Sequence, residues 1–170
     1  AKSSLRPSPL GTVGIISPWN FPVGLIFYPI ASVFAAGNRA MVKPSEITPA
    51  TANIIKEGVQ KYFDSSELAV ITGGPAVGEQ FSALKLDHLL FIGSNRVAKK
   101  VASQAAKNLV PTTLELGGKS PTIIGRSANM KLAAERILFS KTLNAGQICL
   151  SPDYIFVKKN DEKNLISELQ

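Results

Sequence analysis

Short runs of apolar residues, most of them β-branched, alternate along this chain with longer segments of helical character. Glycine, proline or polar residues separate the two kinds of segment. Apolar runs of this length, without polar residues at every second position, are typical of strands that are buried on both faces. Strands that alternate with helices form parallel sheets, because each parallel pair needs a crossover connection. The pattern therefore predicts an α/β fold with a doubly wound parallel sheet.

The expected elements divide into two groups. Five strands are expected in the first group, at residues 12–17, 40–42, 68–72, 88–92 and 112–116. The helices between them are expected at residues 23–36, 48–63, 77–84 and 97–109. A second group then follows, with a strand within 119–125, a helix at 129–143, a strand at 154–157 and a helix from 161. We expect residues 1–117 to form most of one domain and residues 118–170 the beginning of a second.

Bulk composition limits the possible functions. The charge of +7 comes from 19 basic and 12 acidic residues, but the lysines are scattered and lack aromatic neighbours suited to base stacking, so no nucleic-acid partner is expected. The uncharged stretch between Arg6 and Arg39 is interrupted by prolines and glycines, so no membrane span is expected. The start shows no signal peptide. The missing initiator methionine and an end within a helical pattern indicate an internal fragment.

Ligands of an open parallel sheet bind at the carboxyl ends of its strands. The glycines and polar residues of this chain gather at those ends, at Trp19-Asn20, Lys43 to Glu46, Gly73-Gly74, Gly93-Ser94 and Glu115 to Gly118. The dinucleotide fingerprint G-x-G-x-x-G is absent. Gly93-Ser94 leads into a helix, so it is either a phosphate seat or an ordinary loop with a serine cap.

Cys149 is the only cysteine, so the chain cannot form an internal disulfide, and a cytoplasmic location is expected. A thiolate attacks carbon electrophiles where the chain leaves it accessible. Taken alone, however, an isolated cysteine is more often a small buried hydrophobe. His88 is the only histidine, and we expect a structural role for it. The sequence suggests no metal site.

Five motifs in order resemble the aldehyde dehydrogenase superfamily. They are Pro18-Trp19-Asn20-Phe21-Pro22, Lys43-Pro44-Ser45-Glu46, Phe91-Ile92-Gly93-Ser94, Glu115-Leu116-Gly117-Gly118-Lys119-Ser120-Pro121 and Gly146-Gln147-Ile148-Cys149. Asp87 to Phe91 and Pro152-Asp153-Tyr154 are most similar to the coniferyl aldehyde dehydrogenases and to the class 3 and fatty aldehyde enzymes. The resemblance covers the chain from about Leu10 onward. It implies a Rossmann-like NAD-binding domain, followed by the start of an α/β catalytic domain.

The resemblance also implies catalytic roles. Cys149 matches the nucleophile, whose thiolate would give a thiohemiacetal and then a thioester. Asn20 matches the side-chain amide that stabilises the oxyanion, and Glu115 matches the general base that activates water for hydrolysis. In this context an accessible nucleophile at Cys149 becomes the favoured interpretation over a buried thiol.

Cofactor contacts are implied at the strand ends. The matching positions are Ser17, Pro18, Trp19, Lys43, Ser45, Glu46, Gly93, Ser94, Leu116 and Gly117. Lys43 and Glu46 match residues that hold the adenosine ribose, and a carboxylate there would repel a 2′-phosphate. NAD is therefore the expected cofactor, with NADP possible. Gly117 and Gly118 are expected to let the chain pass the nicotinamide closely, and Lys119 to be structural.

The expected function is the oxidation of an aldehyde, aromatic such as coniferyl aldehyde or long-chain aliphatic, to the carboxylic acid. One alternative is acyl transfer to coenzyme A, which the presence of Glu115 disfavours because a hydrolytic base serves only when water is the acceptor. The other is a catalytically silent dinucleotide-binding or structural protein, which Cys149 disfavours. The resemblance further implies a homo-oligomer, dimer or tetramer, and little activity for these 170 residues alone.

Overall fold

The computed structural model describes residues 3–6 and 8–170. The chain divides into two compact units, Ala1–Leu116 and Gly117–Gln170, which are described separately. The sequence-based division after residue 117 lies one residue away from this boundary.

The first unit alternates strands with helices in the order that the apolar pattern predicts. Its elements are β1 (Thr12–Ile16), α1 (Gly24–Ala35), β2 (Arg39–Lys43), α2 (Pro49–Tyr62), β3 (Leu68–Val70), α3 (Pro75–Ser82), β4 (His88–Ile92), α4 (Asn95–Ala106) and β5 (Thr112–Glu115). Each expected strand is present. The uncharged stretch between Arg6 and Arg39 forms a strand, a loop and a helix, and among the described residues no helix combines the length and apolarity that a membrane crossing needs.

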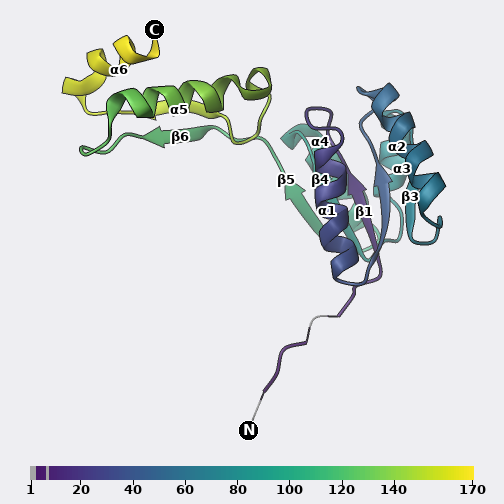
Figure 1. Ribbon diagram of the computed structural model, residues 1–170. Helices are drawn as coiled ribbons and strands as arrows, with labels where there is room; N and C mark the ends of the chain where they lie inside the picture. Colours follow the sequence, from purple (N-terminus) through teal and green to yellow (C-terminus); the bar gives the residue numbers. More distant parts are fainter. Residues whose placement is uncertain (1–2, 7) are drawn as a thin grey trace. The chain divides into compact units, whose positions relative to one another are not determined.

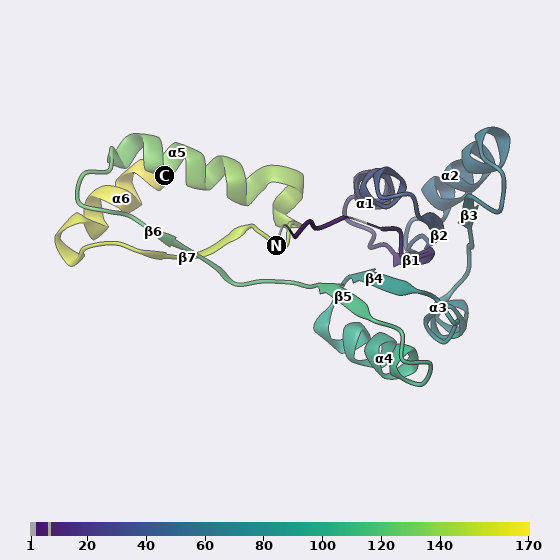
Figure 2. The ribbon, with the colours of Figure 1, turned by 90° about the horizontal axis from the view of Figure 1, so that it is seen from below.

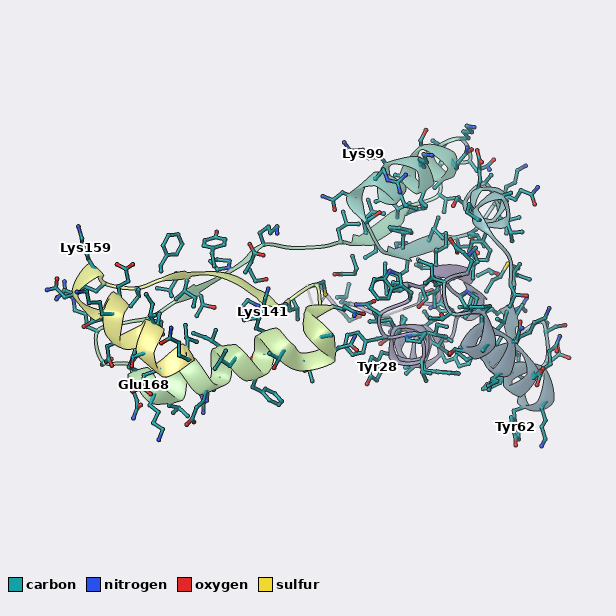
Figure 3. All side chains as sticks on the ribbon, turned by 90° about the horizontal axis from the view of Figure 1, so that it is seen from above. Tyr28, Tyr62, Lys99, Lys141, Lys159 and Glu168 are labelled. Carbon is teal, nitrogen blue, oxygen red and sulfur yellow. The ribbon has the colours of Figure 1, made fainter. Side chains whose placement is uncertain are left out.

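The five strands form one parallel sheet in the order β3-β2-β1-β4-β5 (Figure 1). The chain adds β2 and β3 on one side of β1 and then returns to add β4 and β5 on the other. Helices α1 and α2 cover one face of the sheet, and α3 and α4 cover the other (Figure 2). Tyr28 on α1 and Tyr62 on α2 accordingly lie on the opposite side of this unit from Lys99 on α4 (Figure 3). The prediction of a doubly wound parallel sheet is confirmed.

Alternate side chains of the central strands pack into two separate hydrophobic cores, one on each face of the sheet. Val13 and Ile15 of β1 face α1 and α2, in a cluster that includes Ile26, Ile30 and Ile55. The opposite cluster, beside α3 and α4, contains Ile16, Phe81, Leu89, Phe91, Ala98, Val101, Ala105 and Val110. Because both faces of the sheet are covered, its central strands are apolar at successive positions.

The ends of α3 and α4 differ from the expected positions by two or three residues. Helix α4 begins two residues before the expected position 97, and the Oγ of Ser94 accepts a hydrogen bond of 3.4 Å from the backbone N–H of Val97. Helix α3 begins at Pro75, two residues before the expected position 77, because proline suits the first turn of a helix. Helix α4 ends at Ala106, three residues before the expected position 109.

Leu109 lies in the turn that follows the end of α4. It has a φ of 55° and the chain reverses around it, with hydrogen bonds of 3.1 Å from Leu109 N to Ala106 O and from Val110 N to Ala105 O. This is the position where glycine is favoured, because a left-handed residue with a Cβ is strained. The Leu109 side chain is 88% exposed and so contributes little packing.

We therefore expect Leu109→Gly to stabilise the first unit by about 1 kcal/mol, the strain of a left-handed residue with a Cβ. Equilibrium unfolding in urea measures the change. The control is Leu109→Ala, which removes the side chain but keeps the Cβ, and which should not be stabilising. A gain of equal size in both variants would show that loss of the exposed leucine, and not relief of backbone strain, is responsible.

The second unit contains β6 (Ser120–Ile123), α5 (Met130–Thr142), the short helix η1 (Leu143–Gly146), β7 (Pro152–Phe156), the short helix η2 (Lys159–Asp161) and α6 (Glu162–Leu169). Strands β6 and β7 pair in parallel, with an irregularity between Ser120 and Pro121. Helices α5 and α6 lie on one side of this pair (Figure 1). Their buried contacts include Ala134 and Leu165, whereas Ile123 and Phe156 are exposed.

Candidate active site

The carboxyl ends of β1 and β4 lie side by side where the strand order reverses. Phe91 of β4 pairs with Ile16 of β1, so the loops that begin at Ser17 and at Gly93 leave the sheet next to each other. An open α/β sheet binds its ligands at such a reversal, in the crevice outside the strand ends. The topology therefore places most of the predicted cofactor residues at the same edge of the sheet, near the carboxyl ends of β1 and β4.

Lys43 ends β2 with its side chain only 3% exposed. Its Nζ donates hydrogen bonds to the carbonyl of Pro44 at 3.0 Å and to Oε2 of Glu46 at 2.9 Å. A buried ammonium requires partners of this kind. The main-chain N–H of Ser17 donates to the carbonyl of Lys43 at 3.1 Å, which ties the ends of β1 and β2 together.

Sequence analysis did not single out Gly78, which lies on α3 against the methylene groups of Lys43. A Cβ at Gly78 would stand 3.3 Å from Cε and 3.5 Å from Cδ of the lysine. Its place inside an expected helix could have identified it, since a glycine within a helix often reflects a packing requirement. Gly78 therefore leaves room for the lysine stem.

Glu46 is ionised more readily than an ordinary glutamate. Partial burial favours its neutral form, but the hydrogen bond from Lys43, a backbone hydrogen bond and the positive charge of Lys43 together outweigh that effect and hold the pKa of Glu46 below its ordinary value of 4.5. The carboxylate is 41% exposed, so it remains open to a further hydrogen-bond donor. Of the two side chains, only the Glu46 carboxylate is accessible, and the buried ammonium of Lys43 holds it in place.

Removal of Lys43 should raise the pKa of Glu46. In the wild-type protein the depressed pKa stabilises the fold above pH 4.5, and this contribution is lost as the pH falls through the pKa of the folded state. We expect Lys43→Met to leave the partial burial while removing the pairing, so that the pKa rises and this acid-sensitive contribution disappears. A carbon-detected NMR titration of the glutamate carboxyl groups measures it, with Lys61→Met as the control. A Glu46 pKa that stays depressed in Lys43→Met would contradict the assignment.

Two buried hydroxyl groups near these strand ends have no hydrogen-bond partner among the residues that the structure describes. They are the Oγ of Ser17, a residue that is 3% exposed, and the Oγ1 of Thr48. Native proteins satisfy nearly all buried polar groups, so such atoms are candidates for contact with a ligand or an ordered water. The hydroxyl of Ser45, by contrast, accepts a hydrogen bond of 3.3 Å from the N–H of Ile47.

Gly93 and Ser94 connect β4 to α4. The N–H of Gly93 donates to the carbonyl of Glu115 at 3.0 Å, and the Ser94 hydroxyl caps the helix. The expected serine cap is thus present. This cap is compatible with a phosphate-binding site, because the backbone N–H groups at the amino end of a helix attract anions. Gly93 and Ser94, together with Ser17, Lys43 and Glu46, carry hydrogen-bond donors and acceptors of the kinds that a dinucleotide needs.

The remaining predicted residues of the first unit also follow strand ends. Pro18, Trp19 and Asn20 lie in the loop after β1; Asn20 is half-buried, whereas Trp19 is 43% exposed. Trp19 is therefore not a core residue of this unit. Glu115 is the exposed last residue of β5, and Leu116 packs partly against the core beside α4. Gly117 follows as the first residue of the second unit.

Cys149 lies in the second unit, in the loop between η1 and β7, and its side chain is exposed. The local preference for a buried thiol is therefore wrong here, and the thiol is accessible, as the motifs favoured. Its role as a nucleophile stays a prediction. Three consecutive residues before this loop are left-handed, namely Asn144, Ala145 and Gly146, with φ values of 50°, 55° and 77°. Sequence analysis did not predict this conformation, which is strained for alanine. Such strain is common beside functional groups.

Other titratable residues have structural partners. His88 is the first residue of β4, at the amino end of the sheet, and its Nε2 lies 2.9 Å from the Oγ1 of Thr113. This agrees with the structural role expected for it. Lys119 forms an ion pair of 3.1 Å with Asp153. Within residues 3–6 and 8–170, no three His, Cys, Asp or Glu side chains gather as a metal site would require.

Comparison with known proteins identifies relatives along the whole chain. The family model described as "Aldehyde dehydrogenase family" matches residues 1–170. A protein of Caulobacter vibrioides named "Probable coniferyl aldehyde dehydrogenase" is 56% identical over 170 residues, which are 100% of this chain and 35% of the relative. The chain thus spans about a third of the length of the curated relatives that it matches.

Solved structures agree with this match. The structure titled "Substrate bound state of Staphylococcus Aureus AldH" is 46% identical and superposes with a TM-score of 0.90, over 95% of this chain and 35% of the other. A Mycobacterium tuberculosis aldehyde dehydrogenase complexed with NAD+ is 34% identical, with a TM-score of 0.86 over 95% of this chain and 34% of the other.

Proposed function

Because the chain belongs to the aldehyde dehydrogenase family, we propose that the full-length protein containing it oxidises an aldehyde to the carboxylic acid. The observation that carries this proposal is the exposed thiol of Cys149, the only cysteine of the chain, at the position that matches the family nucleophile. The first unit acts as the NAD(P)-binding domain and the second as the beginning of the catalytic domain.

Cys149 begins the reaction. Its thiolate adds to the aldehyde carbon, a carbon–sulfur bond forms, and the carbonyl oxygen becomes an oxyanion. Collapse of this thiohemiacetal expels a hydride and leaves a thioester on Cys149. A bound nicotinamide supplies the hydride acceptor. Water then attacks the thioester, and the acid and the free thiol are released.

Asn20 stabilises the oxyanion. Its side-chain amide and the backbone N–H of Cys149 are the two donors, and each such donor typically lowers the barrier by about 3 kcal/mol. We therefore expect Asn20→Ala to lower kcat by about 10²- to 10³-fold. Steady-state kinetics measures the loss, and NAD(P) affinity measured by calorimetry is the control, because the asparagine acts on the aldehyde oxygen. A fall in cofactor affinity that accounts for the whole loss would contradict this role.

NAD is the favoured cofactor, with NADP as an alternative. The carboxylate of Glu46, held ionised by Lys43, would accept a hydrogen bond from a ribose 2′-hydroxyl and would repel a 2′-phosphate. The solved relatives include both kinds of enzyme, since one is complexed with NAD+ and another, 31% identical, is titled an E. coli NADP dependent enzyme, so the preference for NAD rests on Glu46. Glu46→Gln should therefore narrow the difference between the dissociation constants of NAD and NADP.

We propose a small-molecule aldehyde as the substrate. An aromatic aldehyde such as coniferyl aldehyde is favoured by the name of the Caulobacter vibrioides relative, and a long-chain aliphatic aldehyde is the alternative. Hydrolysis is favoured over acyl transfer to coenzyme A because Glu115 is present as a base. We further propose a homo-oligomer, dimer or tetramer, in the cytoplasm, and little activity for residues 1–170 alone.

An aldehyde panel with product identification tests the proposal. The full-length protein is assayed with coniferyl aldehyde and a long-chain aliphatic aldehyde, with each dinucleotide and with or without coenzyme A. We expect NAD(P)H and free acid in equal amounts, independent of coenzyme A. Acyl-coenzyme A as the product would favour the acylating alternative. Dinucleotide binding without turnover of any aldehyde would favour a silent binding protein.

A further inference from the structure

Gly118 lies against the main chain of Cys149 within the second unit. A Cβ at Gly118 would stand 3.0 Å from the carbonyl oxygen of Cys149, closer than ordinary van der Waals contact. The backbone of Gly118 is not left-handed, so the obstacle to a side chain there is the nearby carbonyl, which would have to shift by a few tenths of an ångström, and not the backbone conformation. The same substitution at Gly125 would meet nothing within 4 Å. We infer that Gly118 is a positioning residue for Cys149, an inference that rests on the proposed function.

The residues after Gly118 hold it in place. Ser120 pairs with Pro152 at the start of the β6–β7 ladder, and Lys119 forms its ion pair of 3.1 Å with Asp153. The segment from Gly118 to Ser120 therefore runs beside the segment from Cys149 to Asp153. A methyl group on Gly118 cannot be accommodated by sliding β6 without disturbing this pairing, so the carbonyl of Cys149 has to move.

Tight turns restrict how the cysteine loop can respond. On the amino-terminal side, Gly146 is left-handed, and a Cβ there would stand 3.2 Å from the carbonyl of Lys141. On the other side, the N–H of Ser151 donates to the carbonyl of Ile148 at 3.1 Å. Ser151 itself is 8% exposed. A displacement of the Cys149 carbonyl is thus carried to the adjoining Cα, and with it to Sγ and to the backbone N–H.

That displacement should affect one kind of thiol reaction more than another. Acylation of Cys149 by an activated ester passes through a tetrahedral oxyanion, for which the backbone N–H must be correctly placed. Alkylation by iodoacetamide forms a carbon–sulfur bond as iodide leaves and develops no oxyanion. Gly118 therefore matters for the first reaction and much less for the second.

The test compares Gly118→Ala with Gly125→Ala in the full-length protein. Thiolate attack on p-nitrophenyl acetate forms an acyl-thioester and releases p-nitrophenolate, and we expect this acylation to fall about tenfold in Gly118→Ala, since small misplacements of catalytic groups are costly. Alkylation by iodoacetamide should change less than about twofold, because no oxyanion must be held. Amide hydrogen exchange in a peptide spanning 147–151 should be faster. Gly125→Ala should match the wild type in all three measurements.

The possible outcomes are distinguishable. Unchanged hydrogen exchange, or faster exchange with unchanged acylation, would overturn the inference. Equal losses of acylation and alkylation would also overturn it, because they indicate general damage to the loop. If Gly118→Ala does not fold, Lys119→Met is used, because it removes the 3.1 Å ion pair with Asp153 that holds the same segment beside the cysteine loop, and the same ratio of acylation to alkylation is measured. An unchanged ratio and unchanged hydrogen exchange in Lys119→Met would overturn the inference. Acylation by p-nitrophenyl acetate that persists in Cys149→Ala would instead count against the proposed function.

Discussion

Cys149→Ala should abolish aldehyde-dependent NAD(P)H formation, with a fall in kcat of at least about 10⁴-fold, the loss expected when a covalent nucleophile is removed. No other thiol exists in the 170 residues to take its place. The measurement is steady-state turnover of the full-length protein with its best aldehyde.

The effect should be confined to chemistry. Because the Cys149 side chain is exposed, its loss creates no core cavity, so the thermal midpoint and the dissociation constant of NAD should stay close to those of the wild type. The matched control is Cys149→Ser, which keeps a weaker nucleophile and should also be inactive or nearly so. Turnover by Cys149→Ala at the wild-type rate would eliminate the mechanism.

Glu115→Gln should stop the reaction at the thioester. Glutamine keeps the size of the side chain but cannot accept the proton of the attacking water, so steady-state turnover should fall by about 10²- to 10⁴-fold. Hydride transfer does not need this base. Rapid mixing should therefore show a burst of about one NAD(P)H per site, followed by a slow steady state.

Glu57→Gln provides the control for this variant, because Glu57 is an exposed carboxylate on α2 outside the candidate site. It should retain normal turnover without a burst. A Glu115→Gln protein that loses the burst as well as the steady state would show that Glu115 acts before hydrolysis, and the general-base role would then be wrong.

Local patterns were sufficient to predict the strands and helices of the first unit. Apolar runs such as Val13 to Ile16 and Leu89 to Ile92 identify strands because both faces of each strand are buried. The order of the strands could not be read in the same way. Which strand pairs with which depends on contacts between residues far apart in sequence, such as Ile16 with Phe91.

The residues that sequence analysis missed are those whose roles depend on close approach or strain. Ala145 has a left-handed backbone conformation, whereas the helix propensity of alanine predicts a right-handed one. Gly78 was not singled out, and Gly118 was expected to lie close to the nicotinamide, with no contact to Cys149 predicted, because what a Cβ would meet is not evident from sequence spacing. Cys149 illustrates the converse case. Its local sequence favoured burial, and only its place among five motifs predicted an exposed thiol.

The central claim is that Cys149 carries the acyl group during turnover, and mass spectrometry of a trapped intermediate tests it most directly. Glu115→Gln protein is mixed with aldehyde and NAD, quenched in acid and digested. We expect the peptide that contains Cys149 to gain the mass of the acyl group in place of one hydrogen, with an amount that matches the burst of NADH. Full formation of NADH with an unmodified Cys149 peptide, or with the acyl group on another residue, would contradict the claim.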